Sequence, residues 1–399
     1  MTTLVQPAYP FINVFIDTSA LVPVAQRAPG VVAVVGLADP AAAVAENTPT
    51  EVTDHGSVLA NFAKAGAPNT LTRSLDQILG QDPRPSKIYG VRTDSAKDYA
   101  PALAGLEAAD DVTFVCLANE IDVGNASAGI NPATNLMALK EHVENMSASG
   151  QKRMAVAMID PKIAKTPTYA ADVLAVGSYG KLTSDDGRMI LIAARGATTD
   201  PGNSLAPAAD AAAAAMGAIA GYTPSASVVL KQVRGFSMPI TSQYTPSEIT
   251  TLAGAGALPL IDPALIPGTG LYFADGGTLS ADAARNYVDI VRVLDDIEFR
   301  LRAGLIGSIG DSRITKAGLT SIRIRVEGIL GPLQQAAVID DYNVVIPLLS
   351  ILSLPESARS ITDEAQVVTA RSTRQVSVLV SITYGPAVHR LNVTLAPKF

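Results

Sequence analysis

The sequence predicts a mixed α/β protein, and three observations support this fold class. Apolar residues make up 48% of the 399-residue chain and charged residues only 17%, so most of the chain has the material for a large core and is not disordered. The middle of the chain alternates apolar, strand-like segments with helix-like segments. The last third changes to long amphipathic helices followed by an alternating strand. At about 150 residues per domain, this length predicts two or three domains.

The N-terminal region predicts an arm followed by a small β-rich segment. Short β-forming runs occur at Phe11–Ile16 and at 31–37, and Pro23 and the Pro29-Gly30 pair interrupt the chain between them. Chain ends fray unless they are tied down. We therefore expect residues 1–30 to be an arm that docks on a neighbouring chain, and residues 31–90 to form a small β-rich segment.

Residues 91–265 predict a domain built on a largely parallel sheet. Four apolar runs predict strands, and the three segments between them predict helices. The predicted strands are 112–118, 153–159, 189–194 and 227–233, and the predicted helices are 131–146, 169–176 and 208–220. Fully apolar strands that alternate with helices are typical of a parallel sheet covered on both faces.

Residues 266–399 predict a second domain that ends in a β-hairpin. Apolar residues at helical spacing predict one helix over 283–305 and another over 313–330. The segment 374–384 then alternates, which places five side chains on one face: Val376, Val378, Val380, Ile382 and Tyr384. The Gly385-Pro386 pair predicts a turn, after which a second run alternates through Leu391, Val393 and Leu395.

Few side chains in this sequence suit catalysis or metal binding. Cys116 is the single cysteine and lies in an apolar strand, so we expect an inert, buried thiol. His55, His142 and His389 have no partner at metal-ligand or triad spacing, so we expect all three to be structural, with His142 on the polar side of a helix. The sequence has no GxxxxGK[ST] loop, and no GxGxxG turn follows the apolar run 31–36. It therefore predicts no metal and no cofactor.

The charge is acidic overall, with one basic exception. A formal net charge of -7 excludes a broad footprint for nucleic acid, and adjacent acidic pairs such as Asp295-Asp296 predict solvated faces or helix caps. Four basic residues and no acidic ones lie between 313 and 325. At about 100° per residue, Arg313, Lys316 and Arg323 fall within about an 80° arc, while Arg325 points away. This basic stripe suits an acidic partner surface, and the alternative is a solvated helix face.

Signals for export or membrane insertion are missing from the sequence. The first ten residues have neither a basic region nor a long apolar region, which a secretory signal needs. The most apolar stretch, 344–354, is about half the ~20 residues that span a bilayer. We therefore expect no membrane insertion.

The order of these features resembles the contractile tail sheath family of phages and phage-like injection machines. The resemblance spans most of the chain and is strongest in the C-terminal third, whereas the middle region matches only in type. The segments that carry it are Leu271–Leu279, Arg285–Ile297, Gly304–Gly307, Arg313–Leu333, Ile339–Val344 and the closing run that begins at Arg374–Val378.

The resemblance implies a fold with two parts and a role in assembly. An inner α+β domain, made from both chain ends, would carry terminal exchange strands, and an outer α/β domain would be formed by 91–265. Stacked hexameric rings would surround an inner tube, and contraction from a metastable extended state would drive that tube through a target envelope without a nucleotide. The strands donated to neighbours would comprise Phe11, Ile12, Val14 and Ile16 at one end, and Leu391, Val393 and Leu395 at the other.

The resemblance also implies partners and a location. Arg313, Lys316 and Arg323 would contact the inner tail tube protein, and baseplate and tail terminator proteins would complete the assembly. No direct contact with nucleic acid is implied. The protein would be assembled in the host cytoplasm and would function in a virion tail or an extracellular phage-like particle. The single-chain pattern favours these machines over type VI secretion, whose sheath has two chains.

Two other classes of protein remain as alternatives at this point. One is another self-assembling shell protein, such as a capsid-like protein. The other is an α/β-fold enzyme, which would place a polar cleft at the carboxyl ends of its strands.

Overall fold

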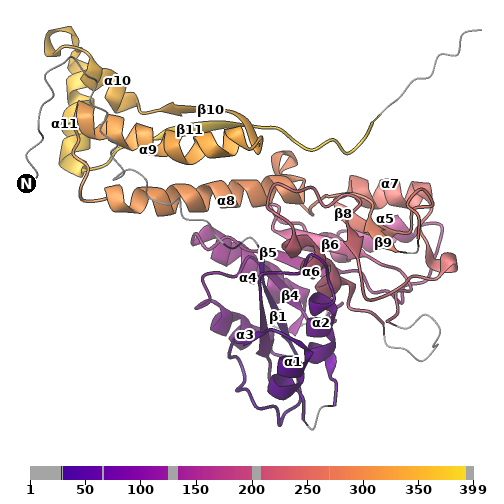
Figure 1. Ribbon diagram of the computed structural model, residues 1–399. Coiled ribbons are helices and arrows are strands. Elements are labelled where there is room, and N and C mark those ends of the chain that lie inside the picture. The colour runs from indigo at the N-terminus through magenta and orange to yellow at the C-terminus, as the bar shows by residue number, and fades with distance from the viewer. Residues whose placement is uncertain are drawn as a thin grey trace, which may run out of the picture.

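The chain folds into an α/β domain (residues 30–287) and a smaller C-terminal domain (residues 288–384), as the computed structural model in Figure 1 shows. The described residues are 28, 30–64, 67–124, 134–199, 208–268 and 270–391. One large apolar core fills the first domain, and two small apolar clusters fill the second.

A mixed sheet forms the centre of the α/β domain. Within the described residues its strand order is β2-β3-β1-β4-β5-β6-β8-β9-β7. The strands are β1 Val31–Gly36, β2 Thr50–Val52, β3 Lys87–Arg92, β4 Phe114–Leu117, β5 Met154–Met158, β6 Met189–Ala193, β7 Gln232–Val233, β8 Ala257–Ile261 and β9 Leu271–Phe273. The pairs from β3 through β1, β4, β5 and β6 to β8 are parallel, and β2, β9 and β7 add antiparallel pairs at the two edges. The expectation of a largely parallel sheet is confirmed.

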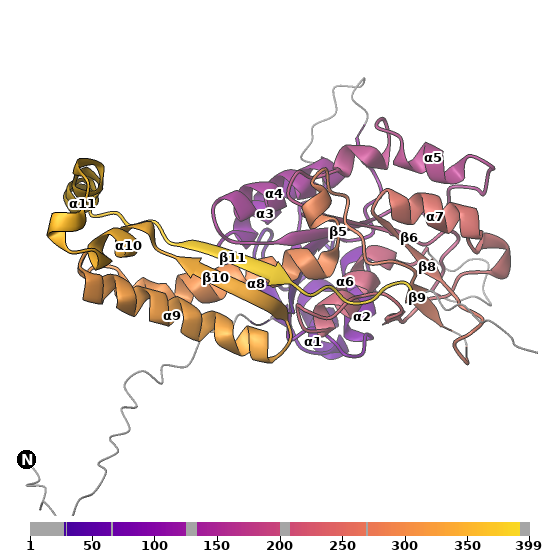
Figure 2. The same cartoon turned by 90° about the horizontal axis from the view of Figure 1, so that it is seen from above.

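Helices cover both faces of this sheet, so its central strands are buried along their whole length. The helices are α1 His55–Phe62, α2 Thr70–Leu79, α3 Tyr99–Leu106, α4 Leu136–Ala148, α5 Tyr169–Leu174, α6 Ala211–Gly221 and α7 Pro246–Gly254. Helix α2 packs on α6 and α3 packs on α4, and Figure 2 shows these pairs on opposite sides of the sheet. Every residue of β1, β4, β5 and β6 is buried, which explains their uninterrupted apolar sequences.

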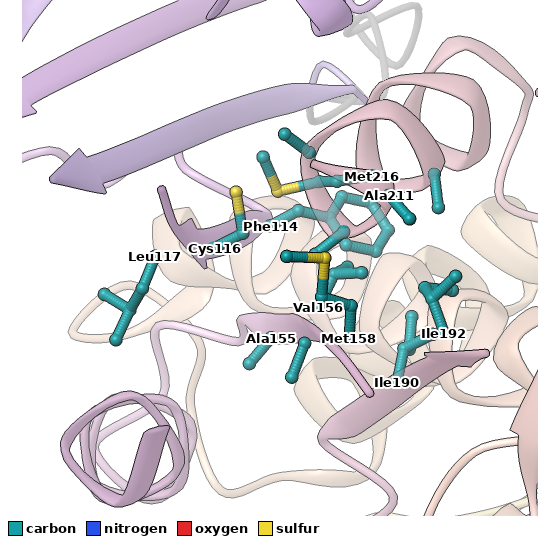
Figure 3. Close-up of a cluster of buried hydrophobic side chains, with 14 of the residues drawn as sticks. Phe114, Cys116, Leu117, Ala155, Val156, Met158, Ile190, Ile192, Ala211 and Met216 are labelled. Carbon is teal, nitrogen blue, oxygen red and sulfur yellow. The ribbon is translucent and has the colours of Figure 1, made fainter. Parts of the chain in front are cut away.

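Helix α6 lies against the middle of the sheet because its side chains are small. It is almost entirely alanine and glycine, and its residues 211–220 are all buried. A Cβ at Gly217 would come within 3.1 Å of the Ile78 Cα atom, so α2 and α6 approach closely only with glycine there. Figure 3 shows Met216 of α6 in one cluster with Phe114, Val156 and Met158 of the sheet.

Two expectations for this domain need correction. Residues 31–90, expected as a separate β-rich segment, instead supply β1, β2 and β3 to the same sheet as the segment that follows. The strand expected at 227–233 is reduced to its last two residues, which form β7. In both cases the partner strand lies far away in the sequence, because β1 pairs with β4 and β7 pairs with β9.

The C-terminal domain packs helices against a two-stranded antiparallel ribbon. Its elements are α8 Val288–Leu305, α9 Lys316–Gln335, β10 Ile339–Val345, α10 Pro347–Ser353, α11 Ile361–Thr373 and β11 Leu379–Tyr384. Short 3₁₀ helices occur in both domains. Those in the α/β domain are Tyr179–Leu182, Ile240–Ser242 and Ala283–Arg285, and those in the C-terminal domain are Ile306–Ser308 and Glu356–Ala358. The two long helices expected from the sequence are present, but α10 and α11 were not anticipated.

The closing strand has a different partner from the expected one. Strand β11 pairs with β10 in the register Val344–Val380 and Tyr342–Ile382, and Val380, Ile382 and Tyr384 face the helices as their alternation predicts. The strand begins only at Leu379, because α11 continues to Thr373. The expected hairpin partner began at Leu391, which is described but lies outside any strand.

Helix α8 joins the two domains through buried charged contacts. Arg188, just before β6, makes a two-pronged ion pair with Asp295 of α8, at 2.5 and 3.0 Å. Arg292 donates to the backbone carbonyls of Ile219 and Tyr222, at 3.1 and 2.7 Å, and so caps the C-terminus of α6. Burial lowers the pKa of Arg292 to about 10, so the guanidinium stays charged at neutral pH and matches the negative end of that helix.

The sequence predicts a solvated face or a helix cap for the acidic pair Asp295-Asp296. The pair is instead largely buried on α8. The side chains of Asp295 and Asp296 are each only 14% exposed, and Asp296 pairs with Arg300 at 2.7 Å. The sequence could not reveal this burial because the covering surface comes from the sheet of the other domain.

Candidate interaction surfaces

The expected basic stripe is divided by the start of α9. Helix α9 begins at Lys316, and the Thr315 side chain accepts a hydrogen bond from the Gly318 N–H at 3.2 Å. Arg313 precedes this cap and is not helical, so its place on a common 80° arc is wrong. Arg313, Lys316 and Arg323 are all exposed.

Two of the basic side chains near this helix have partners within the domain. Arg323 pairs with Glu327 at 2.7 Å, one helical turn further on, and Arg325 donates to the Ser308 hydroxyl at 2.8 Å. Glu327 lies two residues beyond the window that appeared purely basic. An ordinary i,i+4 inspection would have found it.

Arg313 and Lys316 form a smaller positive patch with the N-terminus of α9. Neither makes an ion pair among the described residues, and the first turn of α9 has no acidic residue. The exposed backbone N–H groups of a helix start add a partial positive charge of their own. Ile306 and Ile309, in the turn between α8 and α9, are 69% and 81% exposed. We call these four residues the α9 patch; it combines positive charge with exposed apolar surface.

A groove lies beside β10 in the same domain. Its volume is about 620 Å³, and its walls come from α9, the end of β10 and α10. Arg323 and Glu327 line it, together with the exposed apolar side chains of Ile324 and Val345. Within the described residues β10 pairs only with β11, and β11 only with β10, so each strand has a second edge without a strand partner. Such edges, with backbone groups free to pair, can accept an added strand.

The segments expected to be donated lie mostly outside the described residues. This applies to Phe11, Ile12, Val14 and Ile16 at the N-terminus, and to Val393 and Leu395 at the C-terminus. Leu391 is described and is 81% exposed.

Within the described residues, close packing and hydrogen bonds fill the crevice where many α/β enzymes bind ligands. The order β3-β1-β4-β5 puts the topological switch point between β1 and β4. There Gly36 packs so tightly on Ala118 that a Cβ at Gly36 would lie 2.3 Å from the Ala118 Cβ. The adjacent polar groups bond to one another: the Ser74 hydroxyl and the Asn119 N–H donate to Asp210 at 2.6 and 2.7 Å.

A second buried hydrogen-bonded pair lies at the same carboxyl ends of the parallel strands. The Tyr99 hydroxyl donates to Glu120 at 2.5 Å, and both side chains are almost fully buried. Burial, followed by the charge of Glu120, raises the pKa of Tyr99 far above its usual range, so Tyr99 serves as a permanent hydrogen-bond donor. The carboxylates of Asp210 and Glu120 accept hydrogen bonds that hold the neighbouring loops together. This arrangement supports structure rather than proton transfer.

Two of the candidate titrating residues, Cys116 and His142, are buried, and the expected place of His142 needs correction. Cys116 is fully buried, and burial raises the pKa of its thiol. His142 is not on a polar face: it is 7% exposed, and its Nε2 atom lies 3.0 Å from the guanidinium of buried Arg153. Burial, with the charge of Arg153, lowers the pKa of His142 to about 4.

The described ranges hold neither a cluster of metal-ligating side chains nor a helix that could span a membrane. No group of three or more His, Cys, Asp or Glu side chains there could hold a metal ion. No helix in that part of the chain is both long and apolar enough to cross a bilayer.

An α/β domain of this topology, joined by a long helix to a domain with a two-stranded ribbon, is the fold of contractile sheath proteins. The PVC sheath complex of an extracellular contractile injection system, in its contracted state, aligns with a TM-score of 0.67 at 14% identity over 98% of each chain. The helical sheath of the anti-feeding prophage, also contracted, aligns with a TM-score of 0.66 at 13% identity over 98% of this chain and 99% of that one. The sheath tail protein of Desulfitobacterium hafniense aligns with a TM-score of 0.56 at 11% identity, over 84% of this chain and 93% of that one.

The resemblance inferred from the sequence is thus confirmed at the level of the fold. No protein-family model and no curated protein matches the sequence. The shared fold therefore rests on structure, and function has to be argued from surfaces.

Proposed function

We propose that this protein is a structural subunit of a contractile tail sheath and is not an enzyme. The observation that carries the proposal is the shared fold over 98% of both this chain and a contracted sheath protein. Both domains and the helix that joins them are included in that match. In the proposed assembly, subunits form hexameric rings that stack around an inner tube.

The ribbon of β10 and β11 is the proposed acceptor for strands from neighbouring copies. Its unpaired edges and the groove beside β10 offer backbone pairing and apolar contact to an extended segment. The donors would be residues 11–16 and 391–395. Exchange between non-equivalent surfaces produces an open helical assembly, and it keeps subunits connected while they move.

The α9 patch is the proposed contact with the tube. Arg313 and Lys316 would face acidic groups of the tube in the extended state, and the exposed Ile306 and Ile309 would add apolar contact. An exposed ion pair contributes only about 0–1 kcal/mol. A weak contact repeated over many subunits holds the tube and still releases it when the sheath contracts.

The proposed stroke draws on energy stored in the assembled state. An extended sheath held in a metastable form contracts when its interfaces rearrange, and the tube is driven through the target envelope. Partners would be the tube, the baseplate and the tail terminator, in a virion tail or an extracellular phage-like particle assembled in the host cytoplasm.

Electron microscopy of the purified full-length protein tests this proposal. Hollow, striated tubes are the expected product. Closed shells would instead favour a capsid-like protein, and a monomer or small closed oligomer under all assembly conditions would favour an α/β enzyme.

Deletion of Met1–Pro23 tests the exchange of the N-terminal arm. The truncated protein should remain a soluble monomer with the circular dichroism spectrum of the full chain, yet form no tubes. Long tubes from the truncated protein would disprove the role of this arm.

Charge reversal tests the contact with the tube. Arg313→Glu combined with Lys316→Glu should leave folding intact but give sheaths that lack a tube or have contracted prematurely. The matched control is Lys64→Glu with Arg73→Glu, which reverses two exposed charges on the α/β domain. Normal extended particles from the first variant would contradict the assignment.

A further inference from the structure

The chain after β11 crosses from the C-terminal domain to the α/β domain. In Figure 2 this segment runs from the end of β11 past α8 towards β9. It forms no helix or strand between 385 and 391, and Val388 within it is 80% exposed. Burial of an apolar stretch therefore does not explain its course, and specific side-chain contacts at two points do.

The first contact holds the end of β11 on α8. The Tyr384 hydroxyl donates to Asp289 Oδ2 at 2.7 Å, and Asp289 is 3% exposed in the first turn of α8. Burial and this bond raise the pKa of Tyr384 above its usual range. The hydroxyl therefore remains a donor at any physiological pH.

The second contact holds His389 in a cradle made by three separate segments of the α/β domain. The His389 Nε2 atom lies 2.9 Å from the Ser227 hydroxyl. Its ring meets the Tyr287 ring edge-on, with centroids 5.0 Å apart and an interplanar angle of 77°. The ring also packs over Gly276, where a Cβ would lie 3.7 Å from His389 Cε1.

Arg390 adds a charged contact next to the cradle. Its guanidinium lies 3.7 Å from Asp275, whose side chain is 13% exposed. Beyond this point Leu391 is 81% exposed.

We propose that Ser227, Asp275, Gly276 and Tyr287 form a docking site for the C-terminal segment of the same chain. The segment binds this site through His389 and Arg390. The docked segment gives the chain after Arg390 a fixed starting point on the α/β domain. Docking at His389 orders the six residues 385–390 before any neighbour is met.

This docking has two physical consequences for assembly, which rest on the proposed strand exchange. Each residue ordered in advance saves about 1–2 kcal/mol that binding would otherwise cost. A shorter tether also raises the local concentration of the donated strand. Above all, a fixed exit point selects which neighbour the strand can reach, which an open helical assembly requires. His389 is therefore a positioning residue for assembly.

Limited proteolysis of the full-length, unassembled protein tests the docking itself. Ser227→Ala combined with Asp275→Asn weakens the cradle and leaves the segment's own sequence unchanged. Loss of one hydrogen bond and one ion pair should speed trypsin cleavage after Arg390 by about five- to tenfold. The control, Ser247→Ala with Asp262→Asn, makes the same exchanges at exposed positions of the same domain and should cleave like the wild type. Equal cleavage rates in all three proteins would overturn the docking.

Tube formation, measured by light scattering and electron microscopy, tests the role in assembly. The cradle variant and His389→Ala should assemble several-fold more slowly than the wild type, whereas Val388→Ala should not. Wild-type assembly rates in a cradle variant that trypsin cleaves faster would overturn the role of a fixed exit point. If the wild type itself forms no tubes, the proposed function fails, and the proteolysis result still decides the docking.

Discussion

Replacement of Arg188 by methionine is predicted to weaken the junction between the two domains severely. The Arg188 side chain is 4% exposed and that of Asp295 is 14% exposed, and both guanidinium amino groups donate to the carboxylate. Methionine fills a similar space but donates nothing. The Asp295 carboxylate would then be left largely out of water without its two strongest donors.

The expected loss in free energy of unfolding is about 3–5 kcal/mol. That is the range measured when one partner of a buried ion pair is removed, and it is a large share of the about 5–15 kcal/mol that stabilises a typical domain. Arg188→Met combined with Asp295→Leu should recover most of the loss, because apolar replacement of a whole buried pair is often neutral. Arg302→Met is the matched control: Arg302 is 60% exposed and pairs with Glu298 on the same helix, so it should cost less than about 1 kcal/mol.

Urea unfolding followed by far-ultraviolet circular dichroism measures these differences. Tryptophan fluorescence is not an option, since the chain has no tryptophan. The slope of the transition should stay constant among the variants, so that midpoints report stability. A loss below about 1 kcal/mol in Arg188→Met, or a double variant as unstable as the single one, would refute the reasoning about this junction.

Three further predictions concern the α/β domain. Gly36→Ala should cost about 1–3 kcal/mol by overpacking, and Ala118→Gly in the same chain should restore part of the loss; urea titration of both decides, and no rescue would contradict the close contact. The pKa of His142 is lowered to about 4, so between pH 6.5 and 4 the unfolded chain binds a proton that the folded chain does not. The free energy of unfolding should therefore decrease by up to about 3 kcal/mol as the pH is lowered through this range. The difference in unfolding free energy between wild type and His142→Asn should change between about pH 7 and about pH 4.5, and a constant difference would count against this prediction. Cys116 should react with a thiol reagent only as fast as the protein opens, and immediate labelling of the native protein would show that the strand is not buried.

The junction also matters for the proposed sheath. In that proposal the β10–β11 ribbon and the α9 patch both lie in the C-terminal domain, so the α/β domain moves with them only through its connection at α8. Helix α8 is fixed to the sheet domain by Arg188, by Lys152 and by the carbonyls that Arg292 caps, and it also packs with α9. Buried, two-pronged contacts resist rotation better than apolar packing alone, because each has a preferred direction.

The sequence by itself determined the elements whose environment is uniform. Strands β4, β5 and β6 were predicted within two residues because both of their faces are buried, so every position is apolar. The alternation of Val380, Ile382 and Tyr384 likewise predicted a strand with one face on a core. The resemblance to contractile sheath proteins added the overall class, which the fold confirms.

Tertiary structure decided what depends on partners distant in the sequence. Strand β1 lies between β3 and β4 and not in a segment of its own, and β11 pairs with β10, which precedes it by more than thirty residues. His142 is buried beside Arg153, which lies just before β5, and Arg313 leaves the basic stripe because Thr315 caps the helix after it. Periodicity records whether a side chain meets core or water, but not which segment supplies that core. The filled crevice, the groove beside β10 and the cradle around His389 each join segments far apart in the chain, so only the folded molecule could show them.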